Sequence, residues 1–151
     1  MERTAQCHCG SLRAIALGQP RINNICHCRA CQRRTGSLFH AGAYFLKADV
    51  RCEGANKVYT RRADSGFDAH FHFCPGCGTS VYWRLDRLPE FVGIAVGCFV
   101  EPDFPLPQWS GWEEVMHPWL SMPASIERFP QGIGGGLAAR VAAALRQDGT
   151  S

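Results

Sequence analysis

The chain has 151 residues, of which 46% are hydrophobic and 19% are charged, and its formal net charge is +3. This length predicts one domain, and the composition excludes a globally disordered chain. No long basic run points to nucleic acid, and no apolar stretch reaches the roughly 18 residues of a membrane-spanning helix.

Cysteine is the one unusual residue type, with nine copies in the chain. Because nine is an odd number, the cysteines cannot all form disulfides within one chain. The first residues lack the apolar segment of a secretory signal, so we expect a cytoplasmic and reducing environment in which disulfides are rare. Clustered thiols in such a protein are more often metal ligands or catalytic groups.

The sequence pattern predicts short strands joined by turns up to about residue 100. In residues 67–73 aromatic residues and Ala69 share one face, whereas Asp68, His70 and His72 share the other, which is the period of a half-buried strand. We therefore expect a mainly β fold of short antiparallel strands. The other strand-like segments are the second half of 7–17, 21–25, 38–50 with a break near Gly42, 57–60, 81–83 and 91–100.

The C-terminal part has a different character. Several prolines make residues 102–130 irregular, and the segment 132–136 is rich in glycine. Leu137, Val141 and Leu145 then recur at helical spacing, which predicts a short helix. We expect a domain over residues 1–130 and a Gly-rich hinge with a short helical or disordered tail over residues 131–151.

Seven of the cysteines form clusters with metal-ligand spacing. A structural zinc ion takes four protein ligands in a tetrahedron, and two tight turns with two thiols each make such a set. A thioredoxin-like role for the Cys-Pro-Gly-Cys turn lacks the βαβ context that it requires. The four expected structural ligands are Cys7, Cys9, Cys74 and Cys77, and the third cluster is Cys26, Cys28 and Cys31.

The three-thiol cluster leaves two interpretations open. Three protein ligands and an open position are typical of a catalytic zinc ion. Alternatively, a fourth side chain closes a second structural site. Candidates for that side chain are His27, His70, His72, Cys52 and Cys98. If they are not ligands, Cys52 and Cys98 are expected to be buried packing residues. His117 and Trp119 are also expected to have a packing role.

Three motifs together resemble the glutathione-dependent formaldehyde-activating enzyme family, which also includes centromere protein V. They cover residues 7–13, 26–37 and 73–79, and the resemblance extends to about Phe129. It implies a Mss4-like fold and two zinc ions per chain. The structural ion would be held by Cys7, Cys9, Cys74 and Cys77, and the catalytic ion by Cys26, Cys28 and Cys31.

The resemblance also implies a carbon–sulfur lyase that forms or cleaves S-hydroxymethylglutathione or a related thiol adduct. The partner would be a small thiol such as glutathione, with no nucleic acid and no membrane. Arg29, Arg33 and Arg34 flank the catalytic cluster, and we expect them to bind substrate carboxylates. Two alternatives remain: a non-catalytic, zinc-stabilised binding module, and a thiol redox switch without stoichiometric metal. No residue stands out as a general base.

Overall fold

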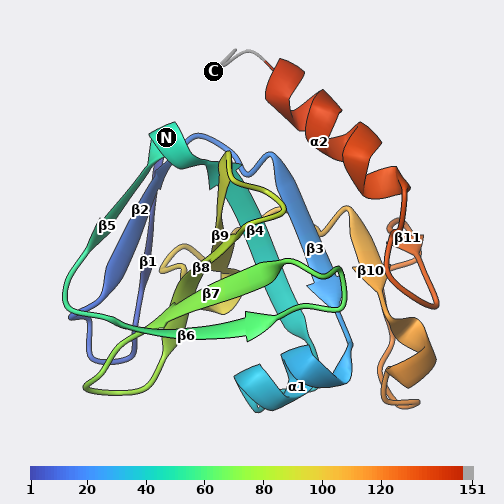
Figure 1. Ribbon diagram of the computed structural model, residues 1–151, viewed down its shortest axis with the longest axis horizontal. Coiled ribbons are helices and arrows are strands. Elements are labelled where there is room, and N and C mark those ends of the chain that lie inside the picture. Colours follow the sequence, from blue (N-terminus) through green and yellow to red (C-terminus); the bar gives the residue numbers. More distant parts are fainter. Residues whose placement is uncertain (148–151) are drawn as a thin grey trace. The chain divides into compact units, whose positions relative to one another are not determined.

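The computed structural model describes residues 1–147, so the predicted tail residues 148–151 lie outside the described part of the chain. The chain divides into two compact units, which we describe separately. Unit 1 comprises residues 1–20 and 43–104, and unit 2 comprises residues 21–42 together with the chain from residue 105 onward. Strands predominate among the regular elements, which confirms the mainly β prediction (Figure 1).

Unit 1 contains two groups of antiparallel strands. The first is a three-stranded sheet in the order β1-β2-β5, and the second is a meander in which β6, β7, β8 and β9 pair in turn (Figure 1). The short 3-10 helices η1 (Lys47–Asp49) and η2 (Val96–Cys98) follow β4 (His40–Leu46) and β9 (Phe91–Ala95). The strands are β1 (Glu2–Gln6), β2 (Arg13–Leu17), β5 (Val50–Glu53), β6 (Lys57–Arg62), β7 (Asp68–Phe73), β8 (Ser80–Leu85) and β9 (Phe91–Ala95).

The core of unit 1 is built from both groups of strands. Leu12 lies beside β2, whereas Val81 and Ile94 come from the meander, and all three side chains are fully buried. Cys7 and Cys74 belong to the same apolar cluster, each with 1% of its surface exposed. Two of the predicted metal ligands are therefore fixed by the core itself, because their turns cannot move without disturbing that packing.

Strand β7 shows the predicted alternation at Ala69 and Phe71, whereas Phe67 precedes the strand and is 49% exposed, so its predicted place on the buried face is wrong. Ala69 and Phe71 are buried and pack with Trp83 of β8. Gly93 of β9 pairs with Trp83 across the strands, and a Cβ atom on Gly93 would lie 2.1 Å from Trp83 Nε1. Glycine at this position leaves the space that the indole ring occupies.

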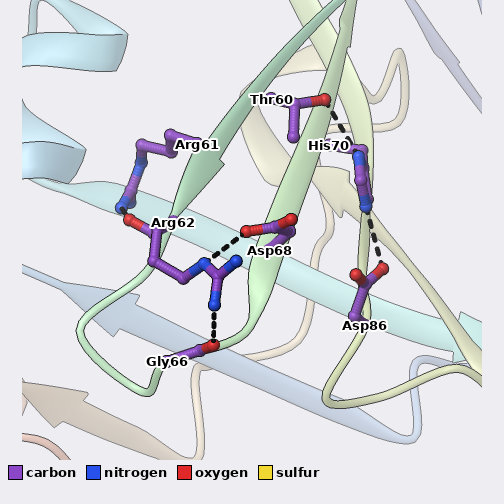
Figure 2. Close-up of polar contacts among 7 residues, drawn as sticks. All are labelled: Thr60, Arg61, Arg62, Gly66, Asp68, His70 and Asp86. Carbon is purple, nitrogen blue, oxygen red and sulfur yellow. Dashed lines mark hydrogen bonds and ion pairs between the residues drawn. The ribbon is translucent and has the colours of Figure 1, made fainter.

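The opposite face of β7 carries exposed polar contacts (Figure 2). Thr60 Oγ1 lies 2.9 Å from His70 Nδ1, and His70 Nε2 lies 2.8 Å from Asp86 Oδ1. Nearby, Arg62 and Asp68 form an ion pair of 2.7 Å. Both ring nitrogens of His70 are thus engaged in contacts that connect neighbouring strands of the meander.

Unit 2 contains parallel pairing that we did not expect. Strand β10 (Trp109–Gly111) pairs in parallel with both β3 (Ile22–Cys26) and β11 (Glu127–Arg128). Strand β4 (His40–Leu46) begins in unit 2 and ends in unit 1. It runs through Gly42 without interruption, so the predicted break there is wrong. Burial on both sides of Gly42 outweighs the weak strand propensity of glycine.

Two α-helices and a short 3-10 helix complete unit 2. They are α1 (Arg29–Thr35), η3 (Glu113–Val115) and α2 (Gly136–Arg146), the last of which confirms the predicted C-terminal helix. Arg140 of α2 lies over the ring of Trp109 at 4.9 Å and pairs with Glu127 at 2.6 Å. At 11 residues, α2 is the longest helix within residues 1–147, and none there is long and apolar enough to cross a bilayer.

Candidate metal centres

Two similar turns in unit 1 present the first group of thiols. In one, the Cys7 amide donates to the Leu12 carbonyl at 2.9 Å, and in the other the Cys74 amide donates to Thr79 at 3.0 Å. Each turn contains a glycine with a positive φ, 76° at Gly10 and 78° at Gly78, a conformation that L side chains rarely adopt. The turns therefore bring two cysteines each to one side of the backbone.

The four sulfur atoms of these turns lie together. The Sγ atoms of Cys7, Cys9, Cys74 and Cys77 are all within 4.8 Å of one another. The Cys7–Cys9 and Cys9–Cys74 separations are 3.5 and 3.6 Å, far longer than a disulfide bond. Zinc–sulfur bonds of about 2.3 Å in a tetrahedron place sulfurs about 3.8 Å apart. Donor type and spacing therefore both fit zinc.

Ser11 lies among these sulfurs. Its hydroxyl oxygen is 3.1 Å from Cys9 Sγ, 3.3 Å from Cys74 Sγ and 3.8 Å from Cys7 Sγ. The amide of Leu12 also donates to Cys7 Sγ at 3.2 Å. A hydroxyl and an amide can donate hydrogen bonds to thiolates, and such contacts orient metal ligands.

The polar surroundings favour the thiolate form of two cysteines in this group, Cys7 and Cys77. The hydroxyl and amide of Thr79 lower the pKa of the Cys77 thiol to about 5. Burial opposes ionisation of Cys7, but the Leu12 amide and the neighbouring thiols and hydroxyl outweigh it, so the pKa of Cys7 is lowered. Thiolates are the forms that bind zinc.

The second group of thiols lies in unit 2 at the junction between β3 and α1. Cys26 ends β3, Cys28 precedes α1, and Cys31 lies in the first turn of α1. The Cys31 amide donates to Cys28 Sγ at 3.4 Å, and the three sulfurs lie within 4.8 Å of one another. The group contains no fourth His, Cys, Asp or Glu among residues 1–147.

The residues considered as a fourth ligand have other surroundings. His72 Nδ1 lies 2.8 Å from Asn56 Oδ1, and its ring stacks on Tyr82. Cys52 and Cys98 are partly buried and pack against the core of unit 1, as expected for packing residues. The metal-capable groups within the described chain are therefore one with four thiols and one with three.

Negative charge is concentrated on one sulfur of the three-thiol group. Hydrogen bonds from the Cys26 thiol and then the Cys31 thiol lower the pKa of Cys28 to about 2. The hydrogen bond to Cys28 and then that to Cys31 raise the pKa of Cys26, which burial raises further. The group therefore offers a Cys28 thiolate that accepts hydrogen bonds from two neighbouring thiols, and sulfur ligands of this kind suit a thiophilic dication.

The ring of His27, which lies between two of these cysteines in the sequence, is fixed by a chain of hydrogen bonds that begins at the buried hydroxyl of Ser110. Its Nε2 lies 3.0 Å from Ser110 Oγ, and Ser110 also bonds to the Glu113 carboxylate, which pairs with Arg128 at 2.8 Å. Because a carboxylate only accepts, Ser110 donates to Glu113 and accepts from His27 Nε2. Burial lowers the pKa of His27, so the ring is neutral and bound away from the thiols.

The three predicted substrate-binding arginines differ in their surroundings. Arg29 is exposed and donates to Gln32 Oε1 at 3.1 Å, and Arg33 is also exposed on α1. Arg34 instead reaches His40 Nδ1 at 2.8 Å. Burial and then the Arg34 charge lower the pKa of His40 to about 3, so His40 is neutral. The roles of the three arginines in substrate binding remain predictions.

The sequence does not single out Gln32, and for His117 it predicts only a packing role. Gln32 Nε2 donates to the carbonyls of His27 at 2.7 Å and Val115 at 3.2 Å, and His117 Nε2 lies 3.3 Å from Gln32 Oε1. No local pattern signals these contacts, because Val115 and His117 are distant from Gln32 in sequence. Trp119 is 70% exposed, so the expectation that it is a packing residue is wrong.

A mainly β chain with two clustered thiol groups that could hold zinc defines a class of small metal-binding domains. Within that class, the chain belongs to the glutathione-dependent formaldehyde-activating enzyme family, whose sequence model matches residues 2–120.

Two individual proteins are similar to this chain, and the first carries the name of the family. A Fusarium vanettenii protein provisionally named glutathione-dependent formaldehyde-activating enzyme is 28% identical over 112 residues, which are 72% of this chain and 56% of the relative. The chain thus spans about half the length of that curated relative. A crystal structure of a Rhodobacter sphaeroides protein superimposes with a TM-score of 0.51 at 26% identity, covering 70% of this chain and 92% of that one.

Proposed function

We propose that the chain is a zinc-dependent carbon–sulfur lyase that forms or cleaves S-hydroxymethylglutathione or the adduct of a similar thiol. The observation that carries this proposal is the three-thiol group of Cys26, Cys28 and Cys31, which has no fourth protein ligand within residues 1–147. Three protein ligands are typical of catalytic zinc, whereas structural zinc has four. Membership of the family supports the substrate class.

In this proposal the chain holds two zinc ions. Cys7, Cys9, Cys74 and Cys77 hold a structural ion, and the three-thiol group holds the catalytic one. When bound there, zinc supplies a Lewis acid that stabilises a thiolate sulfur. The nine unpaired cysteines support a reducing compartment, such as the cytoplasm, as the place of action.

The exposed cations of α1 provide the binding groups for the substrate. Glutathione carries two carboxylates, and Arg29 and Arg33 are exposed on the same short helix as Cys31. Guanidinium groups bind carboxylates through paired hydrogen bonds. Arg34 lies on the same helix, and its contact with His40 Nδ1 at 2.8 Å fixes its position.

The test combines metal analysis with a rate measurement. Wild-type protein should contain two zinc ions per chain and accelerate exchange between free and glutathione-bound ¹³C-formaldehyde, measured by exchange NMR. Cys28→Ser should lose one zinc ion and the acceleration but keep its fold. Cys52→Ser is the matched control, because Cys52 lies outside both thiol groups, and it should retain both properties.

Two results would overturn the proposal. Zinc-edge X-ray absorption that does not change on addition of glutathione, together with an unaccelerated exchange rate, would indicate a non-catalytic zinc-stabilised binding module. A chain that folds without stoichiometric metal would instead favour a thiol redox switch.

A further inference from the structure

Cleavage of a hydroxymethyl thioether requires a group that removes the hydroxyl proton as the carbon–sulfur bond breaks. We propose that His117 is this general base and that it acts through Nδ1. The inference rests on the proposed function and adds to it a proton acceptor supplied by the chain itself.

The position of His117 follows from a short chain of hydrogen bonds. Its Nε2 atom lies 3.3 Å from the side-chain oxygen of Gln32, the residue after Cys31 in α1. The Gln32 amide in turn donates to the carbonyl of His27 at 2.7 Å. His27 lies between two of the three cysteines in the sequence. These hydrogen bonds therefore connect the imidazole of His117 to the turn that carries the three thiols.

The same contacts determine which ring nitrogen of His117 can accept a proton. Gln32 Nε2 faces the carbonyls of His27 and Val115, which only accept, so this atom is the amide nitrogen. Gln32 Oε1 therefore faces His117, and an amide oxygen also only accepts. Nε2 of His117 must carry the hydrogen, which leaves Nδ1 of the neutral ring with a lone pair.

The Nδ1 atom is available for a substrate. Within residues 1–147 no protein group forms a hydrogen bond with it, and the side chain is only partly buried. The exposed ring of Trp119 lies beside it, with the ring centroids 6.3 Å apart. His117 thus has one nitrogen held by the protein and the other without a hydrogen-bond partner among residues 1–147, on a partly exposed ring that lies beside an aromatic side chain.

Other potential bases of unit 2 are either engaged or buried away from solvent; Nδ1 of His27, for example, has no hydrogen-bond partner but is fully buried. His27 is fully buried with Nε2 bound to Ser110, and Nδ1 of His40 accepts from Arg34. The carboxylate of Glu113 is paired with a guanidinium group and only 13% exposed. His117 combines access with an unengaged lone pair, which these groups do not.

The proposed step is balanced without any further reactant. Nδ1 of His117 takes the hydroxyl proton of the adduct, and the oxygen–hydrogen electron pair forms the carbonyl bond. The carbon–sulfur bond breaks, and its electron pair leaves with the sulfur as a thiolate. In the direction of synthesis, the imidazolium returns the proton to the aldehyde oxygen as the thiolate attacks the carbonyl carbon.

The test pairs His117→Gln with a control, His70→Gln, at a partly exposed histidine outside both thiol groups. His117→Gln should reduce the catalysed exchange rate by about 100-fold, as expected for loss of a general base. Its zinc content should remain two per chain, and its KM for glutathione should change less than twofold. His70→Gln should keep the wild-type rate.

A second readout does not depend on activity. Long-range ¹H–¹⁵N correlation spectra of the wild-type protein should show His117 with hydrogen on Nε2, and Gln32→Met should remove this preference. A wild-type ring with hydrogen on Nδ1, or a His117→Gln rate within about threefold of wild type, would overturn the inference alone. Absence of acceleration by wild-type protein would instead refute the proposed function, and the general-base role with it.

Discussion

Replacement of Gly93 by alanine tests the packing that supports unit 1. A Cβ atom on Gly93 would lie 2.1, 2.3 and 2.8 Å from Nε1, Cε2 and Cζ2 of Trp83. Ordinary contacts between carbon atoms are about 3.5–4.0 Å, so the indole would have to move by more than about 1 Å. Trp83 is 1% exposed, and the rings of Tyr44 and Phe71 pack against it, which limits that movement.

The expected loss of stability follows from these contacts. Overpacking a core typically costs about 1–3 kcal/mol. A displaced indole would also weaken the hydrogen bond from Trp83 Nε1 to Tyr44 Oη, now 3.3 Å, which is worth about 1 kcal/mol. We therefore expect Gly93→Ala to lower the free energy of unfolding by about 3 kcal/mol.

Urea denaturation of the zinc-loaded protein, followed by far-ultraviolet circular dichroism, measures this difference. Gly97→Ala is the matched control, because an added Cβ there meets nothing within 4 Å. In a Trp83→Leu background, Gly93→Ala should cost less than about 1 kcal/mol, since the atoms that clash are gone. Equal effects of Gly93→Ala and Gly97→Ala, or an undiminished effect in the Trp83→Leu background, would refute the reasoning.

Three further predictions concern other parts of the chain. Ser11→Ala should weaken zinc binding by the four-thiol group about tenfold in competition with a chromophoric chelator; unchanged affinity would mean that the hydroxyl does not orient the sulfurs. His40 has a folded-state pKa of about 3, below its unfolded value of about 6.5. Because the unfolded chain binds the proton at a higher pH, the folded protein should lose about 1.4 kcal/mol of stability for each pH unit as pH falls through this range. His40→Asn should reduce this acid sensitivity in unfolding experiments between pH 7 and 5, and identical pH profiles would contradict the assignment. Arg140→Ala should lower the unfolding free energy by about 1 kcal/mol through loss of the contact with Trp109, whereas Arg140→Lys should lose less; thermal melts compare the two.

The features predicted correctly from sequence depend on local patterns. Residues 67–73 alternate strictly, and β7 places Ala69 and Phe71 in the core as that period requires. The division of seven cysteines into groups of four and three follows from short spacings and from the geometry of zinc. Such patterns survive folding because the backbone geometry of a strand or a tight turn imposes them directly.

The features that escaped prediction depend on partners distant in sequence. Helix α1 has seven residues and none is buried, so it has no apolar periodicity to reveal it. Contacts made by Cys28 at its start, Gly36 at its end and Gln32 within it define this helix. The parallel pairing of β10 with β3 is likewise invisible locally, because a parallel pair needs a long connection that sequence alone does not trace.

The ligands of the two metal centres differ greatly in their separation along the chain, and this affects how each centre forms. The three-thiol group lies within a single short segment, whereas the four-thiol group joins the turn at Cys7 to the turn at Cys77. Loop closure over the longer segment costs roughly 2 kcal/mol more in chain entropy. During synthesis from the N-terminus, the three-thiol group is complete long before the four-thiol group. If both groups bind zinc, the three-thiol group can therefore take up its ion first, whereas the four-thiol group can do so only after Cys74 and Cys77 have been synthesised.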